Sequence, residues 1–412
     1  MPLPKSSQAN QSSLLIAAVS GRALAQAARR AGYIPLVADF FADQDTEAHC
    51  HACLKVAGDI RHGFEGDFLL HALDTLADAA PSPLLGVVYG AGFEDRPELL
   101  ARLASRWPLL GNDAATVARL KDPAAFFTTL ERLGVPCPRT RTTPPKSMSG
   151  WLCKKRGGAG GSHVGRDTLG AQDRYYQERL NGRAISALFV GDGDRAEVLG
   201  FSEQWTAPKR SAPYCYGGAV RPANLDPVVE AAMTSAVDKA VGAFSIKGLA
   251  SADFIVGAEG ASLLEINPRP GATLDIFDRD EAPLLALHVG AILTQDLKKP
   301  AQAVGAAAGA IVYAPEVLII PAEMSWPDWA ADRPRAGERI DKERPICTVA
   351  ARASSAEDAK RLVEARTATI LAALSGRSGG KGYGQKSGNQ RAPRRLAERQ
   401  HHRRAGRSGA HR

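Results

Sequence analysis

The sequence lacks long hydrophobic runs, an export signal and a dense set of cysteines. No uninterrupted apolar stretch approaches the ~20 residues that a membrane-spanning helix needs, and the first thirteen residues are polar, with two prolines. Six cysteines in 412 residues are too few for the disulfide framework of a small secreted domain. These absences argue against a membrane protein and a disulfide-stabilised module, and they predict a cytoplasmic protein with free thiols.

Acidic residues are scarce at the end of the chain. Residues 376–412 contain eleven Lys or Arg and one acidic residue, Glu398, so this segment carries +10 and the rest of the chain carries −2 of the net +8. Almost no large apolar side chains are present there to bury, which predicts a disordered basic tail. We do not expect a nucleic-acid partner apart from a contact made by this tail, because Tyr383 is its only aromatic residue for base stacking.

Strands that alternate with helices characterise the first hundred residues. Apolar runs at residues 14–19, 34–38 and 84–89 are predicted strands, and residues 23–31 are a predicted helix. This alternation predicts a parallel, Rossmann-like sheet that binds ligands beyond the carboxyl ends of its strands. Its glycines do not form the full Gly-x-Gly-x-x-Gly signature, so NAD binding is not predicted.

A glycine-rich loop follows a segment of helical periodicity at residues 110–133 and a proline-rich connector. The loop, residues 156–163, contains four glycines and comes directly after a predicted strand at residues 151–155. Small residues let consecutive backbone N–H groups converge on a phosphate, and Lys154 or Lys155 would supply positive charge. Taken alone, such a loop is equally compatible with a flexible connection.

The rest of the chain predicts an antiparallel sheet and a small C-terminal unit. Further strands are expected at residues 175–180, 184–190, 196–205, 250–256 and 262–266, and a helix at residues 356–374. We therefore divide the chain into a Rossmann-like domain at residues 1–110, a second domain at 111–300, a C-terminal domain at 301–375 and the tail at 376–412. The predicted fold class is α/β, or α+β overall.

Two acidic residues lie on consecutive strands that a short turn would pair as a hairpin. Asp253 and Glu265 would face each other, and Asn267 lies two residues beyond Glu265 on the same face of its strand. Two carboxylates and an amide are oxygen ligands that suit Mg²⁺. Arg269, two residues further, could hold the charge of a transferring phosphoryl group or of an acyl phosphate. Solvated surface carboxylates are the alternative, but the apolar neighbours of Glu265 favour a buried strand.

The order of these motifs resembles the ATP-grasp superfamily. A glycine-loop lysine, a Gln-Glu strand, an acidic strand and the sequence Leu-Glu-x-Asn-x-Arg follow one another as in that family. The chain is most similar to predicted ATP-dependent carboligases related to biotin carboxylase, with Gly-x-Gly-Phe-Glu early and Tyr-Gly-Gly-Ala in the middle. The resemblance covers residues 14–374 and implies a pre-ATP-grasp domain, an ATP-grasp fold with antiparallel sheets and a small C-terminal domain.

The resemblance also implies ATP and Mg²⁺, with Mn²⁺ as a possible substitute, and assigns roles to residues of this chain. Lys154 would contact the ATP phosphates, and Arg269 would steady the acyl phosphate. The metal ligands would be Asp253, Glu265 and Asn267. The adenine contacts would be Glu178 and Leu180. The loop over the phosphates would contain Gly158, Gly160, Gly161 and Ser162. The acidic ribose contact of the family has no counterpart, since Arg183 and Ser186 lie in that region, and Lys155 replaces the usual proline.

By this resemblance the chain is a ligase that activates a carboxylate as an acyl phosphate and joins it to an amine. A biotin-carboxylase-like enzyme is the first alternative, but Pro270-Gly-Ala-Thr273 replaces the Gln-Val-Glu-His that follows Asn-x-Arg in that family. A nucleotide-binding protein without catalysis is the second. The expected partners are small-molecule carboxylates and amines, and a homodimer is one option for the oligomeric state. Biosynthesis of one-carbon cofactors of the methanopterin or methanofuran type is a finer suggestion of the resemblance.

Three further features stay open at this stage. Cys50 and Cys53, with His49 and His51 beside them, could supply half of a zinc site, but no second half is evident. Residues 214–219, in a predicted loop, could contact the acceptor. Asp275, Asp278 and Arg279 follow Arg269 and could select the substrate, or the acidic residues could simply lie at the start of a helix.

Overall fold

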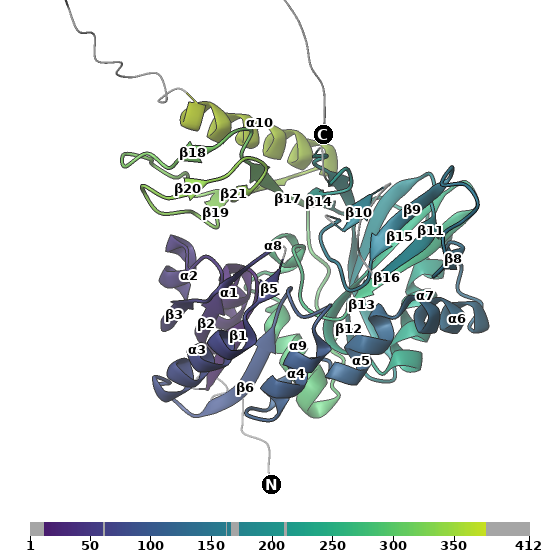
Figure 1. Cartoon of the computed structure of the whole chain (residues 1–412), viewed down its shortest axis with the longest axis horizontal. Helices are drawn as coiled ribbons and strands as arrows, with labels where there is room; N and C mark the ends of the chain where they lie inside the picture. Colours follow the sequence, from purple (N-terminus) through teal and green to yellow (C-terminus); the bar gives the residue numbers. More distant parts are fainter. Residues whose placement is uncertain (1–11, 61, 162, 166–172, 210–211, 376–412) are drawn as a thin grey trace, which may run out of the picture.

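The computed structural model describes residues 12–60, 62–161, 163–165, 173–209 and 212–375. The predicted tail and Ser162 lie outside these residues. Figure 1 shows an N-terminal part in purple, a larger β-rich part in teal and green, and a C-terminal part in yellow-green that lies above the first. Within the described residues, no helix is long and apolar enough to cross a membrane.

The N-terminal part is a parallel sheet, which confirms the predicted Rossmann-like unit. Its strand order is β3-β2-β1-β6-β7, and each pair is parallel. The strands are β1 (Ser13–Ala17), β2 (Ile34–Asp39), β3 (Ala52–Lys55), β6 (Leu84–Tyr89) and β7 (Leu109–Leu110). The helices of this part are α1 (Arg22–Arg30), α2 (Gln44–His49), α3 (Gly66–Asp78) and α4 (Pro97–Ala104), with a small ladder of β4 (Gly58–Asp59) and β5 (Gly63–Phe64). Every residue of β1 is buried, as its apolar sequence predicts.

An antiparallel sheet of eight strands forms the centre of the molecule, in the order β16-β15-β12-β13-β14-β17-β21-β19. Its strands are β12 (Arg183–Asp192), β13 (Ala196–Thr206), β14 (Tyr216–Arg221), β15 (Lys247–Gly257), β16 (Gly260–Asn267), β17 (Ala306–Tyr313), β19 (Ala330–Ala331) and β21 (Pro345–Ala353). Because β17 pairs with β14, the C-terminal part continues this sheet. Because the sheet runs across residue 300 in this way, it does not by itself mark a domain boundary there, and the predicted division stays a prediction.

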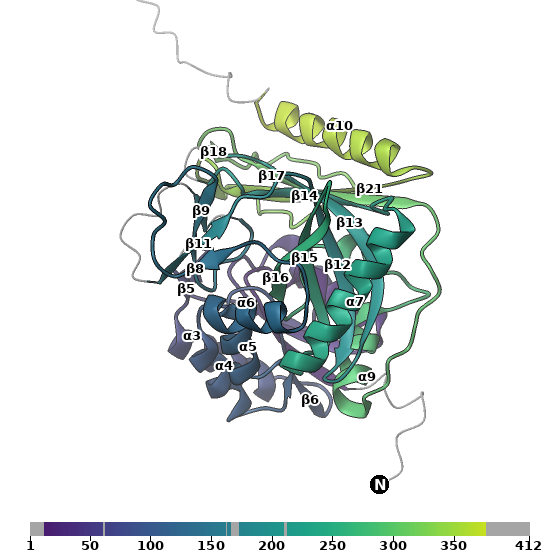
Figure 2. The same ribbon diagram turned by 90° about the vertical axis from the view of Figure 1, so that its right-hand side faces the viewer.

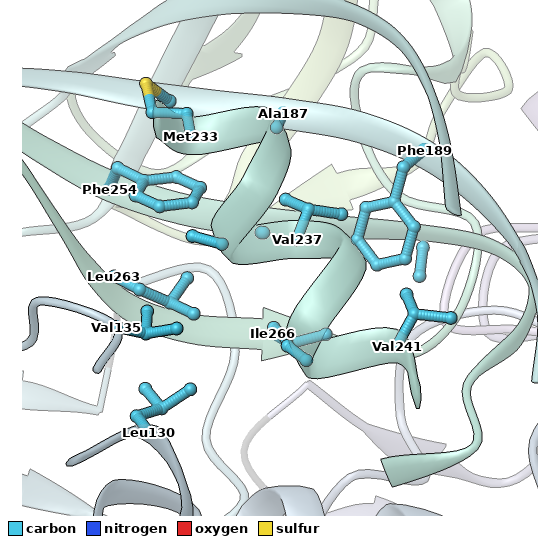
Figure 3. Close-up of a cluster of buried hydrophobic side chains, with 14 of the residues drawn as sticks. Leu130, Val135, Ala187, Phe189, Met233, Val237, Val241, Phe254, Leu263 and Ile266 are labelled. Carbon is cyan, nitrogen blue, oxygen red and sulfur yellow. The ribbon is translucent and has the colours of Figure 1, made fainter. Parts of the chain in front are cut away.

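Two long helices pack on different strands of the central sheet. α7 (Pro227–Phe244) packs on β12 and β13, and α10 (Ala356–Ser375) packs on β17 and β21 (Figure 2). Val237 and Val241 of α7 meet Phe189, Phe254 and Ile266 of the sheet in a buried cluster (Figure 3). The remaining elements of this part are α8 (Leu274–Phe277), α9 (Leu284–Thr294), β18 (Leu318–Ile319) and β20 (Arg339–Ile340). This core holds the hairpin of β15 and β16 in place.

A third, four-stranded sheet carries the lysine and the glycine-rich loop. Its order is β10-β9-β11-β8, and its strands are β8 (Thr140–Arg141), β9 (Trp151–Lys155), β10 (Val164–Gly165) and β11 (Arg174–Glu178). The predicted strand at residues 151–155 is therefore confirmed at both ends. All three sheets together confirm the predicted mixed α/β class.

The helical periodicity at residues 110–133 is confirmed as two helices, whereas one other local prediction was wrong. Asp122 ends α5 (Ala114–Lys121), and its carboxylate caps α6 (Pro123–Arg132). Proline at the second helix's first position suits this break. Residues 216–219 belong to strand β14 and not to a loop.

One buried arginine joins all three parts of the molecule. The guanidinium of Arg22, at the start of α1, donates to Asp275 of α8 at 2.7 Å and to Asp332 before β21 at 2.9 Å. Arg22 is 3% exposed. Since a buried guanidinium requires anionic partners, this residue fixes the N-terminal sheet against the other two parts.

Asp43 is a buried carboxylate beside this junction. Its Oδ1 accepts the N–H of Thr46 and caps α2, whereas its Oδ2 has no hydrogen-bond partner. Burial, followed by the charge of Asp332, raises the pKa of Asp43 to about 7. The folded protein therefore holds this proton more tightly than the unfolded chain does, and the stability that the proton contributes is lost as pH rises from about 4 to about 7.

Replacing Asp43 by Asn is thus expected to stabilise the protein at pH 8 by about 1 kcal/mol or more and to have little effect at pH 4. Asn keeps the oxygen that caps the helix. Thermal unfolding of both proteins across this pH range measures the effect. Asp113→Asn, the same change at the cap of α5, is the control. Equal stabilisation at both pH values would contradict the assignment.

Candidate active site

The hairpin of β15 and β16 brings the predicted acidic residues together. Asp253 is directly opposite Glu265, and Ser251 is opposite Asn267, because a register shift between Asp253 and Phe254 adds one residue to β16 at this point. Asp253 accepts hydrogen bonds from Ser186 at 2.7 Å and from Asn267 at 3.1 Å. The predicted pairing of Asp253, Glu265 and Asn267 is therefore present in the structure.

Two lysines lie against these carboxylates. Lys154 of β9 is 5% exposed, and burial lowers its pKa while the charges of Glu265 and Asp253 oppose that shift. Lys121, at the end of α5, donates its Nζ to Asn267 Oδ1 at 3.1 Å and lies 4.0 Å from Glu265. Lys121 was not among the predicted site residues. The break before Pro123 ends α5 at Lys121, next to the hairpin.

The two carboxylates have different protonation tendencies. Burial raises the pKa of Asp253, and the negative charge of Glu265 raises it further. Burial would raise the pKa of Glu265 as well, but the positive charges of Lys121 and Lys154 lower that pKa. Glu265 is thus held as a carboxylate by its positive neighbours, and Asp253 needs a further cation to ionise as readily.

The chemistry of this set fits Mg²⁺. Two neighbouring carboxylates and an amide are hard oxygen donors, and a divalent cation would offset the repulsion that raises the pKa of Asp253. Asn267 presents its Nδ2 to Asp253 and its Oδ1 to Lys121, so a rotation of the amide would turn its oxygen toward the carboxylates. Among the described residues there is no metal-binding group of three or more His, Cys, Asp or Glu side chains. In the predicted set, Asn267 adds an amide oxygen to the two carboxylates.

Arg269 is clamped by a residue of the N-terminal part. Its Nε and Nη2 both approach Oε1 of Glu94, at 2.8 and 2.7 Å. The other oxygen of Glu94 accepts the backbone N–H groups of Gly92 and Phe93. Positive charge from Arg269 and Lys121 lowers the pKa of Glu94 despite complete burial. The Gly-x-Gly-Phe-Glu motif after β6 thus orients Arg269.

The glycine-rich loop lies over this site and against β14. The carbonyl of Gly160 accepts the N–H of Tyr216 at 3.0 Å. Gly160 and Gly161 have φ angles of 64° and 72°, and an added Cβ at Gly161 would clash with the carbonyl oxygen of Tyr214, whereas nothing lies within 4 Å of one at Gly160. Gly158 packs against the ring of His163.

This difference gives a matched pair of variants. Both Gly160→Ala and Gly161→Ala place a side chain at positive φ, but only Gly161→Ala pushes the loop away from β14. We expect Gly161→Ala to reduce kcat/KM for ATP at least about tenfold more than Gly160→Ala does, because small displacements of positioning groups slow a reaction strongly. Steady-state kinetics with varied ATP would measure this. Equal effects would show that the contact with Tyr214 is irrelevant.

The predicted adenine-binding segment is at the end of β11. The carboxylate of Glu178 forms two hydrogen bonds with Arg139, at 2.8 and 3.0 Å, which lower its pKa. The N–H of Glu178 donates to the carbonyl of Arg139. Leu180 follows the strand and is half-buried. The Glu178 side chain is therefore bound to Arg139. The contact of this segment with adenine stays a prediction, and the backbone would make it.

His163 is a further residue that the sequence did not single out. It lines a pocket with Lys121, Gly157, Gly158 and Glu265. Its Nδ1 is buried without a hydrogen-bond partner. Burial lowers the pKa of His163 to about 4, and the charges of Lys154 and Lys121 contribute. The ring is therefore neutral beside the carboxylate of Glu265.

The structure shows the contacts of the residues whose roles the sequence left open. Cys50 and Cys53 are free thiols that hydrogen-bond to each other, and no zinc-type ligand set surrounds them among the described residues. Asp275 pairs with Arg22 and Asp278 with Arg30. Lys155 pairs with Asp95 at 3.1 Å, which leaves Lys154 as the lysine that faces the carboxylates.

Comparison with known proteins agrees with this arrangement. Residues 121–273 match the family described as ATP-grasp domain, and the match spans the hairpin, the glycine-rich loop and both lysines. This match identifies residues 121–273 as an ATP-grasp domain. A protein of Methanocaldococcus jannaschii is 21% identical over 362 residues, which cover 82% of this chain and 88% of that protein.

Solved structures share the fold along most of the chain. The biotin carboxylase domain of 2-oxoglutarate carboxylase from Hydrogenobacter thermophilus, with MgADP and bicarbonate, has a TM-score of 0.66 at 14% identity, covering 86% of this chain and 89% of that one. L-amino acid ligase from Bacillus licheniformis has a TM-score of 0.63 at 14% identity, covering 86% and 96%. Pyruvate carboxylase from Rhizobium etli has a TM-score of 0.65 at 17% identity and 89% coverage of this chain, which spans only 39% of that longer enzyme.

Proposed function

We propose that this ATP-grasp protein activates a carboxylate as an acyl phosphate and then joins it to an amine. The observation that carries the proposal is the buried group of two carboxylates and two lysines at the β15–β16 hairpin, with Arg269 clamped beside it. A protein that only binds nucleotides has no need of such groups around the phosphates. The resemblance also suggests a role in one-carbon cofactor biosynthesis, but no contact in the site is specific to a substrate of that pathway.

Each group of the site has a role in this proposal. Lys154 and Lys121 would neutralise the ATP phosphates, and the backbone of the glycine-rich loop would hold them. Asp253, Glu265 and Asn267 would hold Mg²⁺, which supplies charge neutralisation for phosphoryl transfer when bound. The backbone near Glu178 and Leu180 would bind adenine. Catalysis is then a matter of positioning and electrostatics, with no protein nucleophile.

The proposed reaction has two steps and needs only ATP, the carboxylate and the amine as reactants. A carboxylate oxygen of the substrate attacks the γ-phosphorus, the bond to ADP breaks, and an acyl phosphate forms. The amine nitrogen then attacks the acyl carbon, phosphate leaves with the bonding electrons, and the nitrogen loses a proton. Arg269 would stabilise the acyl phosphate between the two steps, because Glu94 already fixes its orientation.

A carboxylase related to biotin carboxylase is the rival, since solved structures of such enzymes share the fold. In this chain, the residues after Arg269 lead into α8, whose Asp275 is bound to Arg22. Pro270 and Thr273 replace the side chains that would orient bicarbonate in that family. This difference favours a carboxylate and an amine over bicarbonate and biotin.

Release of ADP in the presence of ATP and Mg²⁺ would test the proposal. A panel of carboxylates would be combined with a panel of amines, and bicarbonate with free biotin would run in parallel. The proposal expects ADP release that requires a carboxylate and increases with an amine. ADP release that depends on bicarbonate and biotin alone would establish the rival function.

A further inference from the structure

Negative charge is in excess beyond the carboxyl ends of β1 and β2, beside the Arg22 junction. The carboxylates of this acidic cluster are Asp39, Asp43, Asp45, Asp275 and Asp332. Among the described residues, two arginines pair with them: Arg22 binds Asp275 and Asp332, and Arg333 binds Asp45 at 3.1 Å. Asp39 accepts only backbone N–H groups. Five carboxylates thus share two guanidinium groups at the edge where a parallel sheet binds ligands.

Asp43 has a buried carboxylate oxygen that receives no hydrogen bond. The residue is 4% exposed, and its Oδ2 has no hydrogen-bond partner. Its neighbours are acidic, since Asp332, Asp45 and Asp39 all act on it electrostatically. A buried carboxylate oxygen without a donor is costly, and a cation with N–H groups would satisfy it. A metal ion fits poorly, because no metal-binding group of His, Cys, Asp or Glu occurs among the described residues.

The acidic cluster is connected to the phosphoryl-transfer site through β14. α8, which carries Asp275, packs on β14. The N–H of Tyr216, the first residue of β14, donates to the carbonyl of Gly160 in the glycine-rich loop at 3.0 Å. The side chains of Asp275 and Asp332 remain 18% and 23% exposed. A small molecule that reaches them is therefore close to the strand that carries the loop's contact.

We propose that the acidic cluster binds the ammonium group of the acceptor amine. This inference rests on the proposed ligation and names its nucleophile as a primary amine with no carboxylate next to the nitrogen, which the cluster would repel. The ammonium form binds first. One of its protons then passes to a carboxylate of the cluster, and the neutral nitrogen attacks the acyl carbon as phosphate leaves.

Amine binding can be measured without turnover. Calorimetry on the full chain would compare 1,4-diaminobutane and benzylamine with their neutral counterparts, 1,4-butanediol and benzyl alcohol, in the wild type and in Asp43→Asn. We expect at least one amine to bind the wild type at least about tenfold more tightly than its alcohol, and Asp43→Asn to remove most of this difference. Asp113→Asn, a cap substitution remote from the cluster, should leave the difference unchanged. Thermal unfolding would check that each variant is folded.

The outcomes separate this inference from the proposed function. Amines that bind no better than the alcohols, or a preference that survives Asp43→Asn, would overturn the amine site. Carboxylate activation is measured separately in the wild type by trapping the acyl phosphate with hydroxylamine as a hydroxamate. Absence of hydroxamate with every carboxylate would overturn the proposed function instead.

Discussion

Replacing Glu265 by Gln is expected to lower the rate of ATP turnover by at least about 10²-fold. Glu265 is the carboxylate that the charges of Lys121 and Lys154 keep ionised. Gln has nearly the same shape but no charge, so it cannot neutralise a metal ion or balance the two lysines. ADP release with Mg²⁺ and a responding carboxylate would measure the loss.

A matched control for Glu265→Gln exists in the same hairpin. Glu259 lies in the exposed turn between β15 and β16, and Glu259→Gln should turn over ATP at the parental rate. Both variants would be compared by thermal unfolding, so that a loss of activity is not confused with a loss of fold. If Glu265→Gln released ADP as fast as the parent, Glu265 would not be a ligand of the metal.

Replacing Arg269 by Lys is expected to reduce kcat by about 10²–10³-fold with a smaller change in KM for ATP. Lys keeps the charge, but it cannot form the two-nitrogen contact with Glu94 that fixes the guanidinium plane. The intermediate would then lose an oriented donor that is needed only after phosphoryl transfer begins. Steady-state kinetics with varied ATP would separate the two parameters.

Arg119→Lys is the control for this substitution. Arg119 lies on α5, is exposed and contacts the carbonyl of Ala243, so its replacement should leave kcat unchanged. Glu94→Gln tests the same clamp from the other side, and we expect a smaller loss because Arg269 would still be present. A variant Arg269→Lys with parental kcat would remove Arg269 from the acyl phosphate site.

Local patterns were sufficient to predict the β15–β16 hairpin. The alternation of side chains along a strand places Glu265 and Asn267 on one face, and the short turn pairs β15 with β16. A register shift between Asp253 and Phe254, which has no signal in the sequence, then sets Asp253 opposite Glu265. The boundaries of β9 and the parallel N-terminal sheet followed from apolar runs of strand length.

Contacts between distant segments were not predictable in this way. Glu94 and Arg269 are 175 residues apart, and only the packing of the N-terminal sheet against the hairpin brings them together. Lys121 was missed because its contact with Asn267 joins residues that are 146 apart in the sequence. The sequence Lys-Asp-Pro at 121–123 contains a cap residue and a helix-starting proline, which signal a helix boundary but not this contact. The Arg22 junction joins three parts of the chain and has no local signal.

The most direct test of the central claim follows the carboxylate oxygen. A carboxylate that supports ADP release would be labelled with ¹⁸O in its carboxyl group, and the phosphate produced in the complete reaction with an amine would be examined by mass spectrometry. Activation as an acyl phosphate predicts one ¹⁸O atom in each phosphate, because the carboxylate oxygen leaves with the phosphoryl group. Phosphate without the label would contradict the proposed mechanism.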